Sequence, residues 1–502
     1  MSPATHKDPR GCLSRESGMT MAMAREDWLS DRQRTAIGRS SLSMPARQAL
    51  VDGVIRPQWG LLDYGSGKGG DVTRLTHLGV AATGWDPHHG GDRPDAPRDV
   101  VTLTYVINVI ENPAERHAVL SDAWSLTEHC LVVSTRLVWE RKQVTGTAIG
   151  DGTLTRRNTF QHLFSPAELR SLVESVTGVR ALSPVPGVVY AFRHDSDRLA
   201  YLARRASPDQ VWEEGADEQS AIAAVVGFLE RRGRMPLVEE TPQMLLPLLT
   251  KLTERQLAKL ATQAADPAEV AEGRKHSTLN VLHLLGVEVF NGRCHFQSLP
   301  LPLQADVRAF FDSYKDAWRR AERLLMKLRD DTYLRNVMRN SVGKMTPTAI
   351  YVHRRAAEHV PVLLKLYEHC GAVAVGRPAD WDVIKLTHEG RSVSWLGYPD
   401  FDRNPHPCLA WSYNVDMRSL EGSYRSYVGR DNRPILHRKH EFLHPSDPAV
   451  PKFERLTEQE IRTGLYKEPH LIGTERGWEA VLSAAGVALK GHRLVRTTEN
   501  RR

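Results

Sequence analysis

The feature that most constrains the fold is a glycine-rich segment between a short apolar run and a helical pattern. The run reads LLDYG and continues SGKGGD, so glycines stand at positions 65, 67, 69 and 70. Glycine takes backbone angles that a side chain forbids, and it lets a ligand approach the backbone closely. The helix that follows offers unpaired N–H groups and the positive end of its dipole. The sequence therefore predicts a strand, a tight ligand-facing loop and a helix.

The alternation of apolar runs and helical patterns extends beyond this loop. Ser43 can cap a helix expected over 43–55, and Pro45 suits its first turn. Strands are expected at 80–86, 99–110 and 129–135, and helices at 69–79 and 113–127. Such alternation predicts a parallel sheet with helices on both faces, which is a Rossmann-like α/β domain.

The pattern changes after residue 136. A DG turn within 144–164 predicts a hairpin, and Ser165 can cap a helix over 165–178. The run GVVYAFR at 187–193 is expected to close the sheet as an antiparallel edge strand. One long amphipathic helix is expected over 299–328.

The length of 502 residues exceeds what one hydrophobic core supports, so several domains are expected. We expect a disordered leader at 1–33, an α/β domain at 34–195, a helical spacer at 196–289 and an α+β domain of unknown function at 290–497.

Two acids flank the glycine loop. Asp63 precedes the first glycine, where it can orient the loop and reach a cationic amino group. Asp86 ends the next strand, where a carboxylate can accept hydrogen bonds from both hydroxyls of a ribose. Dinucleotides and S-adenosylmethionine both use such a site, so Asp86 alone does not decide between them.

The segment at 99–120 favours S-adenosylmethionine, because it resembles the fourth-strand segment of class I methyltransferases. The resemblance implies that Asn108, Val109 and Glu111 lie beside the cofactor at the carboxyl end of the strand. Between Asp86 and Asp99 there is no room for the usual third strand and its helix. The expected cofactor-binding residues are Asp63, Gly65, Ser66, Gly67, Gly69, Asp86, Asn108 and Val109.

A wider resemblance covers about 35–200 and 290–496. It rests on TAIGRSSLSMPARQALVDG, GWDP, YVINVIENPAER, GDGTLTRRNTFQHLF, GKMTPTAIYVH, YPDFDRNPHP, NRPILHRKHEF, LTEQEIRTGL and IGTERGWEAVLSAAGVALKGHRLVR. With these motifs the chain resembles the DNA-phosphorothioation-associated methyltransferases of bacteria. The resemblance implies an S-adenosylmethionine-dependent methyltransferase that acts on DNA in modification or defence, with proteins of a DNA sulfur-modification system as partners. NRPILH differs from the double proline of many members and is interpreted as a structural turn.

Methyl transfer from a sulfonium mainly requires that donor and acceptor are aligned, and an amine or hydroxyl acceptor also needs a proton acceptor. Asn108 and Glu111 are the nearest polar candidates, although Glu111 equally suits the start of a helix. Three residues before the loop are expected either to close over the cofactor carboxylate or to be surface groups: Arg39, Ser41 and Ser43. Two interpretations of the predicted hairpin stay open: it holds phosphates and stacks a base, or it is an edge hairpin with solvated arginines. The residues concerned are Arg156, Arg157, Phe160 and Gln161.

The C-terminal region gathers acids and histidines: Asp400, Asp402, His406, His437, His440 and His444. No pair has a recognised ligand spacing on a predicted helix, so no metal is expected. The basic run HRKH, with Tyr424, Tyr427 and Phe442, suits phosphate contacts and stacking.

The charge and cysteine content bear on partners and compartment. The net charge of +7 suits a nucleic-acid partner, and five scattered cysteines suit a reduced compartment. With no apolar run long enough for a membrane span, no membrane partner and a cytoplasmic location are expected. Two alternatives stay open: a non-catalytic nucleic-acid-binding accessory protein, and a methyltransferase that acts on RNA or a small molecule.

Overall fold

The computed structural model describes residues 32–90, 92–206, 212, 217–249 and 252–497, and the chain forms two compact units. The first unit comprises the chain up to Glu128 together with Val132–Phe164. The second comprises His129–Leu131 together with the chain from Ser165 onward. The predicted disordered leader lies outside the described residues, apart from its last two positions.

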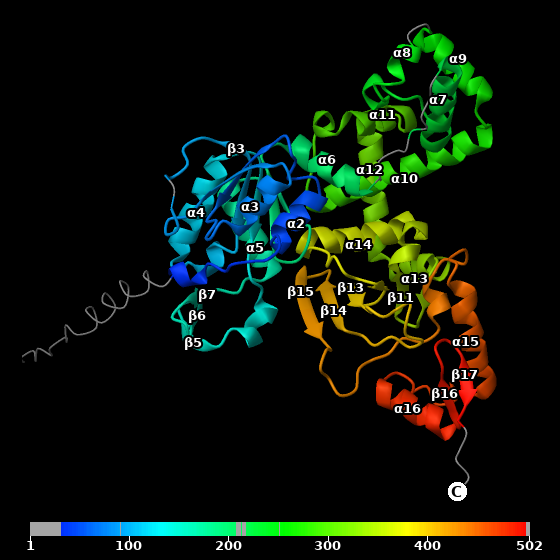
Figure 1. The fold of residues 1–502 in the computed structure, drawn as a ribbon. Coiled ribbons are helices and arrows are strands. Elements are labelled where there is room, and N and C mark those ends of the chain that lie inside the picture. The colour runs from blue at the N-terminus through cyan, green and yellow to red at the C-terminus, as the bar shows by residue number, and fades with distance from the viewer. Residues whose placement is uncertain (1–31, 91, 207–211, 213–216, 250–251, 498–502) are drawn as a thin grey trace, which may run out of the picture. The chain divides into compact units, whose positions relative to one another are not determined.

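The first unit contains most of the predicted parallel sheet (Figure 1). Strand β1 pairs in parallel with β2 and β3, with Gly60 opposite Ala81 and Leu61 opposite Val100. The six-stranded sheet has the order β2-β1-β3-β4-β9-β8. Its strands are β1 (Gly60–Tyr64), β2 (Ala81–Trp85), β3 (Arg98–Thr104), β4 (Thr127–Ser134), β8 (Ala181–Leu182) and β9 (Val188–Phe192). The predicted Rossmann-like α/β arrangement is confirmed.

Of the described α-helices in this unit, two begin after a residue whose side chain caps them, and one follows Gly69 without a side-chain cap. They are α2 (Met44–Val51), α3 (Gly70–His77) and α4 (Pro113–Ser125), with 3-10 turns η1 (Arg32–Thr35), η2 (Ile107–Val109) and η3 (Val138–Gln143). The Ser43 side chain accepts the Ala46 N–H at the start of α2, which confirms the predicted cap. Asn112 caps α4 in the same way, through the N–H of Ala114.

Two strand predictions are corrected, and a third is confirmed. The strand expected over 99–110 ends at Thr104, because Tyr105 takes a left-handed backbone angle (φ 59°) and the chain turns into η2. GVVYAFR forms β9, yet the edge position belongs to β8, which pairs with β9 antiparallel. Strand β2 is the other edge, since the described residues between it and β3 hold only an isolated bridge, from Asp86 to Gly90. The predicted loss of a third strand is therefore confirmed.

The predicted DG hairpin is also confirmed. It forms a separate antiparallel sheet of β5 (Gly146–Ile149), β6 (Gly152–Thr155) and β7 (Phe160–Gln161). At Gly146 a Cβ would lie 1.9 Å from the carbonyl oxygen of Leu154, so glycine is required where the two strands meet.

The second unit begins with helices. They are α5 (Pro166–Thr177), α6 (Asp195–Ala206), α7 (Glu218–Arg232), α8 (Leu246–Leu249), α9 (Glu254–Ala264), α10 (Pro267–Asn291), α11 (Leu301–Phe310), α12 (Tyr314–Met326) and α13 (Asp331–Arg339). Ser165 caps α5 in a capping box with Glu168, as predicted. The single helix expected over 299–328 is wrong: Phe311 is extended (φ −130°), and Ser313 caps a new helix through the Asp316 N–H.

The later part of this unit is an antiparallel sheet with helices, which matches the expected α+β class. The order β10-β11-β12-β13-β14-β15 follows the chain. The strands are β10 (Lys344–Met345), β11 (Ala349–His353), β12 (Val383–Thr387), β13 (Ser392–Gly397), β14 (Trp411–Asp416) and β15 (Glu421–Ser426). The other α-helices and strands described in this unit are α14 (Val362–Val375), α15 (Val450–Thr463), α16 (Glu475–Ala484), β16 (Val487–Leu489) and β17 (Leu494–Arg496). Within the described ranges, every helix is too short or too polar to cross a membrane.

Candidate functional site

A cavity of about 620 Å³ opens in the first unit at the carboxyl ends of β1, β2 and β3. Its wall includes the last residues of these strands, the glycine loop and the segment that precedes α2. In open α/β sheets this end of the strands is the usual place for a ligand. The cavity therefore stands where the glycine loop predicted a binding site.

The glycine loop is held against the end of β2. The N–H groups of Gly65 and Ser66 both donate to the carbonyl oxygen of Trp85, at 2.7 and 3.0 Å. Gly65 has a φ of 85°, and a Cβ there would lie 2.5 Å from Cγ2 of Val106. A side chain at this position would have a strained backbone and would collide with the Val106 side chain, so glycine is required.

Asp86 binds this loop directly. Its Oδ2 accepts the Gly67 N–H at 3.0 Å, and its Oδ1 accepts the N–H groups of His88 and His89 and contacts the His89 ring. Burial opposes ionisation of Asp86, but the hydrogen bonds from His89, His88 and Gly67 outweigh burial and hold its pKa below the ordinary value. Asp86 is thus ionised at neutral pH beside the loop.

Asp63 forms the floor of the cavity at the end of β1. It is buried, and its Oδ1 accepts the hydroxyl of Thr102 at 2.7 Å. Burial raises the pKa of Asp63 to about 6, although the bond from Thr102 acts in the opposite direction. Asp63 therefore titrates close to neutral pH, and a cation bound in the cavity would favour its charged form.

Asn108 presents an unsatisfied acceptor in this wall. Its Nδ2 donates to Oε1 of Gln161 at 3.2 Å. Its Oδ1 is buried and has no hydrogen-bond partner among the described residues. Because an unpaired buried acceptor is costly, this oxygen is suited to receive a donor from a bound molecule.

The segment before α2 contributes a further wall of the cavity, in which Arg39 is the one residue that the sequence named as a candidate. Arg32, Ala36 and Arg39 line the cavity, and a Cβ at Gly67 would lie 3.1 Å from Cβ of Ala36. The Arg39 guanidinium stands 5.3 Å from the ring centroid of Tyr105. Three residues of this segment were expected either to close over the cofactor carboxylate or to be surface groups. Arg39 lines the cavity, Ser41 is exposed, and Ser43 is the buried cap of α2.

Arg32 also pairs with two glutamates near the cavity. It forms ion pairs with both Glu111 and Glu115, and the two carboxylates raise its pKa against the effect of burial. Glu115 lines the cavity, whereas Glu111 is not in the described wall. Of the two catalytic candidates, the structure places Asn108 at the cavity and Glu111 in an ion pair beside it.

Of the remaining predicted contact residues, some line the cavity and others do not. Gly69 lies outside the described wall and instead precedes α3 with a φ of 67°. Phe160 is 3% exposed under the guanidinium of Arg116, so its ring is not presented to a base as expected. Arg156 and Arg157 are exposed beyond β6, and only Gln161 of the hairpin set reaches the cavity. Tyr105 and Arg32 were missed because their roles depend on a strained turn and a distant segment.

Several C-terminal candidates have structural partners in the second unit. Asp402 pairs with Arg355, the His444 ring contacts Ser446, and His440 contacts Thr457. Arg433 pairs with Glu475, which supports the interpretation of NRPILH as a structural turn. His406 and His437 are considered below.

The basic and aromatic set expected to contact phosphate is mostly engaged within the fold. Lys439 is 2% exposed and donates to the carbonyl oxygens of Phe401 and Asn404, so it is not presented to a phosphate. Phe442 is buried, and the Tyr424 ring stacks on Trp411 with centroids 6.1 Å apart. Tyr427 is half-buried against the core that includes Phe442.

No family model matches the chain, and no curated protein matches it. Among solved structures it is similar to magnesium protoporphyrin IX methyltransferase from Synechocystis, with 18% identity over 34% of this chain and 99% of that one, at a TM-score of 0.24. It is also similar to 1,6-didemethyltoxoflavin-N1-methyltransferase from Burkholderia thailandensis, with 15% identity over 37% and 93%, at a TM-score of 0.24. A third is CalS10, an amino pentose methyltransferase from Micromonospora echinaspora, with 15% identity over 38% and 100%, at a TM-score of 0.23.

Proposed function

We propose that the cavity binds S-adenosylmethionine and that the chain is a methyltransferase. The observation that carries the proposal is the 3.0 Å hydrogen bond from the Gly67 N–H to Asp86. It joins a loop too tight for side chains to an ionised carboxylate at the carboxyl edge of a parallel sheet. This geometry suits an adenosyl group, whose ribose hydroxyls need an acceptor where the backbone comes close.

The polar groups of the cavity fit the rest of the cofactor. In Asp86, Oδ1 already has three contacts and Oδ2 has one. One ribose hydroxyl would therefore bind at Oδ2, and the other would compete with His89 for Oδ1. Asp63 would face the ammonium group, and Arg39 the carboxylate, of the methionine portion. The unpartnered Oδ1 of Asn108 is a further acceptor in the same wall.

The bound cofactor supplies an electrophilic methyl group on its sulfonium. The residues of this chain position the acceptor and exclude water, which is the main requirement for such a transfer. We propose that Asn108 Oδ1 accepts a hydrogen bond from the N–H or O–H of an amine or hydroxyl that receives the methyl group, and so orients the lone pair of that group. Glu111 is proposed to receive a proton only when its pair with Arg32 opens, since that pair now occupies the carboxylate.

We further propose DNA as the acceptor, with the sulfur-modified backbone as its context. The net charge of +7 and the exposed Arg156 and Arg157 of the hairpin support a phosphate-rich partner. The motif resemblance to methyltransferases associated with DNA phosphorothioation supports the same acceptor. A sulfur nucleophile in the backbone would need positioning without a base, which fits a site whose candidate base, Glu111, is already paired with Arg32.

Calorimetry with S-adenosylmethionine tests the first step. One site per chain is expected in the wild-type protein, and Gly67→Asp should abolish binding while the circular dichroism spectrum stays unchanged. Aspartate tolerates the left-handed region better than most residues, so this variant should fold. Absence of heat in the wild type would instead support the non-catalytic accessory protein.

Methyl-labelled cofactor tests the acceptor. The protein is incubated with genomic DNA that contains or lacks backbone sulfur, and with total RNA and small metabolites in parallel. Label is expected in the DNA, and the amount of label should be greater in DNA that contains backbone sulfur. Label confined to RNA or metabolites would remove the DNA proposal and leave the methyltransferase proposal intact.

The hairpin arginines provide a second test of the DNA proposal. Replacing Arg156 and Arg157 by alanine should weaken DNA binding and make the plot of log K against log salt less steep. The slope should change by about 1.8, because each phosphate that an arginine neutralises adds about 0.9 to its magnitude. Arg47, which is exposed on α2, is the control for the removal of a positive charge from the same unit. An unchanged slope in the double variant would show that the hairpin does not bind phosphate.

A further inference from the structure

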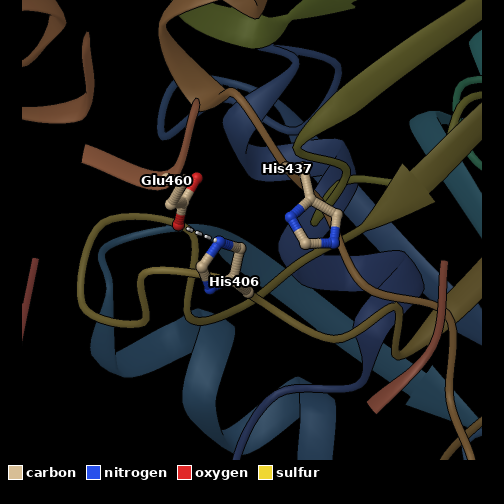
Figure 2. Close-up of side chains that lie close together, drawn as sticks. All are labelled: His406, His437 and Glu460. Atoms are coloured by element: carbon tan, nitrogen blue, oxygen red, sulfur yellow. Dashed lines mark ion pairs between the residues drawn. The ribbon is translucent and has the colours of Figure 1, made fainter. Parts of the chain in front are cut away.

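Two histidines and a glutamate from distant parts of the sequence meet inside the second unit. His406 lies in the loop between β13 and β14, His437 in the segment after β15, and Glu460 on α15. One potential ligand atom from each residue lies within 4.8 Å of those of the other two. Figure 2 shows the Glu460 carboxylate directed at the His406 ring, with the His437 ring beside it.

The cluster is enclosed by protein. His406, His437 and Glu460 are 5%, 8% and 1% exposed. The Trp478 ring covers both imidazoles, with its centroid 4.7 Å from that of His406 and 4.5 Å from that of His437. The Tyr466 hydroxyl donates to Oε2 of Glu460 at 2.5 Å. Polar groups buried this deeply need partners within the protein, because bulk water no longer reaches them.

The hydrogen bonds of His437 fix which of its nitrogens is free. Its Nε2 lies 2.5 Å from the carbonyl oxygen of Ile472. A carbonyl can only accept, so Nε2 carries the proton, and the lone pair of the neutral ring is on Nδ1. That Nδ1 is buried without a hydrogen-bond partner among the described residues. A histidine that ligates a metal is usually oriented in this way, by a carbonyl that accepts its other N–H.

His406 and Glu460 leave further capacity unused. Nε2 of His406 lies 2.8 Å from Oε1 of Glu460, as an ion pair. The pair lacks the alignment of a hydrogen bond, since Oε1 has no such partner within the described structure, and neither has Nδ1 of His406. A metal-free ion pair would therefore use one imidazole and leave the other buried and unsatisfied. A cation between the three side chains would use both rings and the carboxylate.

We propose that His406, His437 and Glu460 bind one Zn²⁺ ion. Imidazole nitrogen with one carboxylate is a ligand set that zinc accepts, whereas magnesium and calcium prefer oxygen alone. Zinc–ligand bonds of about 2.0–2.2 Å place tetrahedral ligand atoms about 3.3 Å apart. Separations of at most 4.8 Å reach that spacing through small side-chain movements.

The site has three protein ligands and leaves the fourth position to water. Cys408, two residues after His406, is not the fourth ligand in this arrangement, because its Sγ contacts Oε1 of Glu475 at 2.9 Å. The ion would join the loop before β14, the segment after β15 and α15. We expect it to stabilise the second unit. The sequence did not predict the site, since Glu460 lies far along the chain and forms no regular ligand spacing with the histidines.

Metal titration of the untagged full-length chain tests this proposal. The protein is stripped with a chelator, dialysed and titrated with Zn²⁺, and bound metal is measured by elemental analysis. One tightly held ion per chain and a higher thermal midpoint are expected. Co²⁺ in place of Zn²⁺ should give the strong visible absorption of a low-coordinate site that contains nitrogen ligands. No stoichiometric binding to the folded, stripped chain would overturn the proposal.

Matched variants locate the ion. His437→Asn and Glu460→Gln should each weaken Zn²⁺ binding by at least about 100-fold, because each removes one of three ligands. Glu460→Gln keeps the shape of the side chain, so it serves if His437→Asn does not fold. The control is His388→Asn: His388 is also fully buried, with Nε2 2.8 Å from the Pro347 carbonyl oxygen and an Nδ1 that lacks a hydrogen bond and lies 3.8 Å from Oε1 of Glu389, but it belongs to no group of three potential metal ligands among the described residues. Affinity that is unchanged in Glu460→Gln, or lost equally in His388→Asn, would refute the assignment.

Discussion

Replacing Gly67 and Gly69 by alanine, one at a time, tests the glycine loop with a matched pair. The two residues have similar left-handed backbones, with φ of 54° and 67°. Alanine in this region costs about 1–2 kcal/mol relative to glycine, so the backbone alone should cause a similar loss of stability in both variants. For a unit of this size, that loss corresponds to a fall in Tm of about 2–4 °C per kcal/mol.

The two positions differ in what the new methyl group would meet. At Gly67 a Cβ lies 3.1 Å from Cβ of Ala36, whereas at Gly69 it meets no described atom within 4 Å. An ordinary contact between carbons is about 3.5–4.0 Å, so Ala36 must move and the cavity wall opens at the segment before α2. Such overpacking costs about 1–3 kcal/mol. If ligand binding needs that wall, Gly67→Ala should bind S-adenosylmethionine about 5- to 150-fold more weakly.

The assay combines calorimetry with thermal unfolding. Gly69→Ala should show the loss of stability with little change in Kd, because Gly69 lies outside the described wall of the cavity. Gly67→Ala should show both the loss of stability and the weaker binding. Equal Kd values for the two variants and the wild type would show that the ligand does not use this wall. A larger loss of binding in Gly69→Ala would reverse the assignment.

Three further predictions concern charges in the two units. Because burial raises the pKa of Asp63 to about 6, the folded chain binds a proton that the unfolded chain (pKa about 3.8) has lost. Stability should therefore fall by up to about 3 kcal/mol as pH rises from 4 to 6, and Asp63→Asn should remove that slope in urea unfolding. Arg32→Ala should weaken cofactor binding in calorimetry, since Arg32 lines the cavity and pairs with two glutamates, whereas the exposed Arg34, outside the described wall, provides the control. Glu288 is 0% exposed and accepts hydrogen bonds from both terminal nitrogens of Arg198. Glu288→Leu should lower the free energy of unfolding by about 3–5 kcal/mol, and adding Arg198→Met should restore most of that loss. A Glu288→Leu variant as stable as the wild type in denaturant would contradict that reasoning.

Local interactions made much of the α/β part of the chain predictable from sequence. Ser43 and Ser165 cap helices through atoms three positions away, so their roles depend on few neighbours. The glycine loop and Asp86 were predicted to face one another, because parallel strands end at the same edge of a sheet. The same reasoning predicted a sheet that ends at β2, since too few residues remained for another strand and helix.

Contacts between distant segments were decided only by the tertiary structure. Arg32 reaches Glu111 and Glu115, Phe160 is buried under Arg116, and Asn108 is left with an unpaired oxygen beside the cavity. Each of these contacts depends on how two distant segments of the chain pack together. The local sequence of either segment does not specify that packing.

The sequence by itself determined the strand–loop–helix unit, its flanking acids and the class of ligand that they suit. The tertiary structure decided which side chains close the cavity, and it brought His406, His437 and Glu460 together. The physical reason is the range of the interactions. Backbone freedom and capping act over a few residues, whereas burial and charge pairing depend on every segment that packs at a given place.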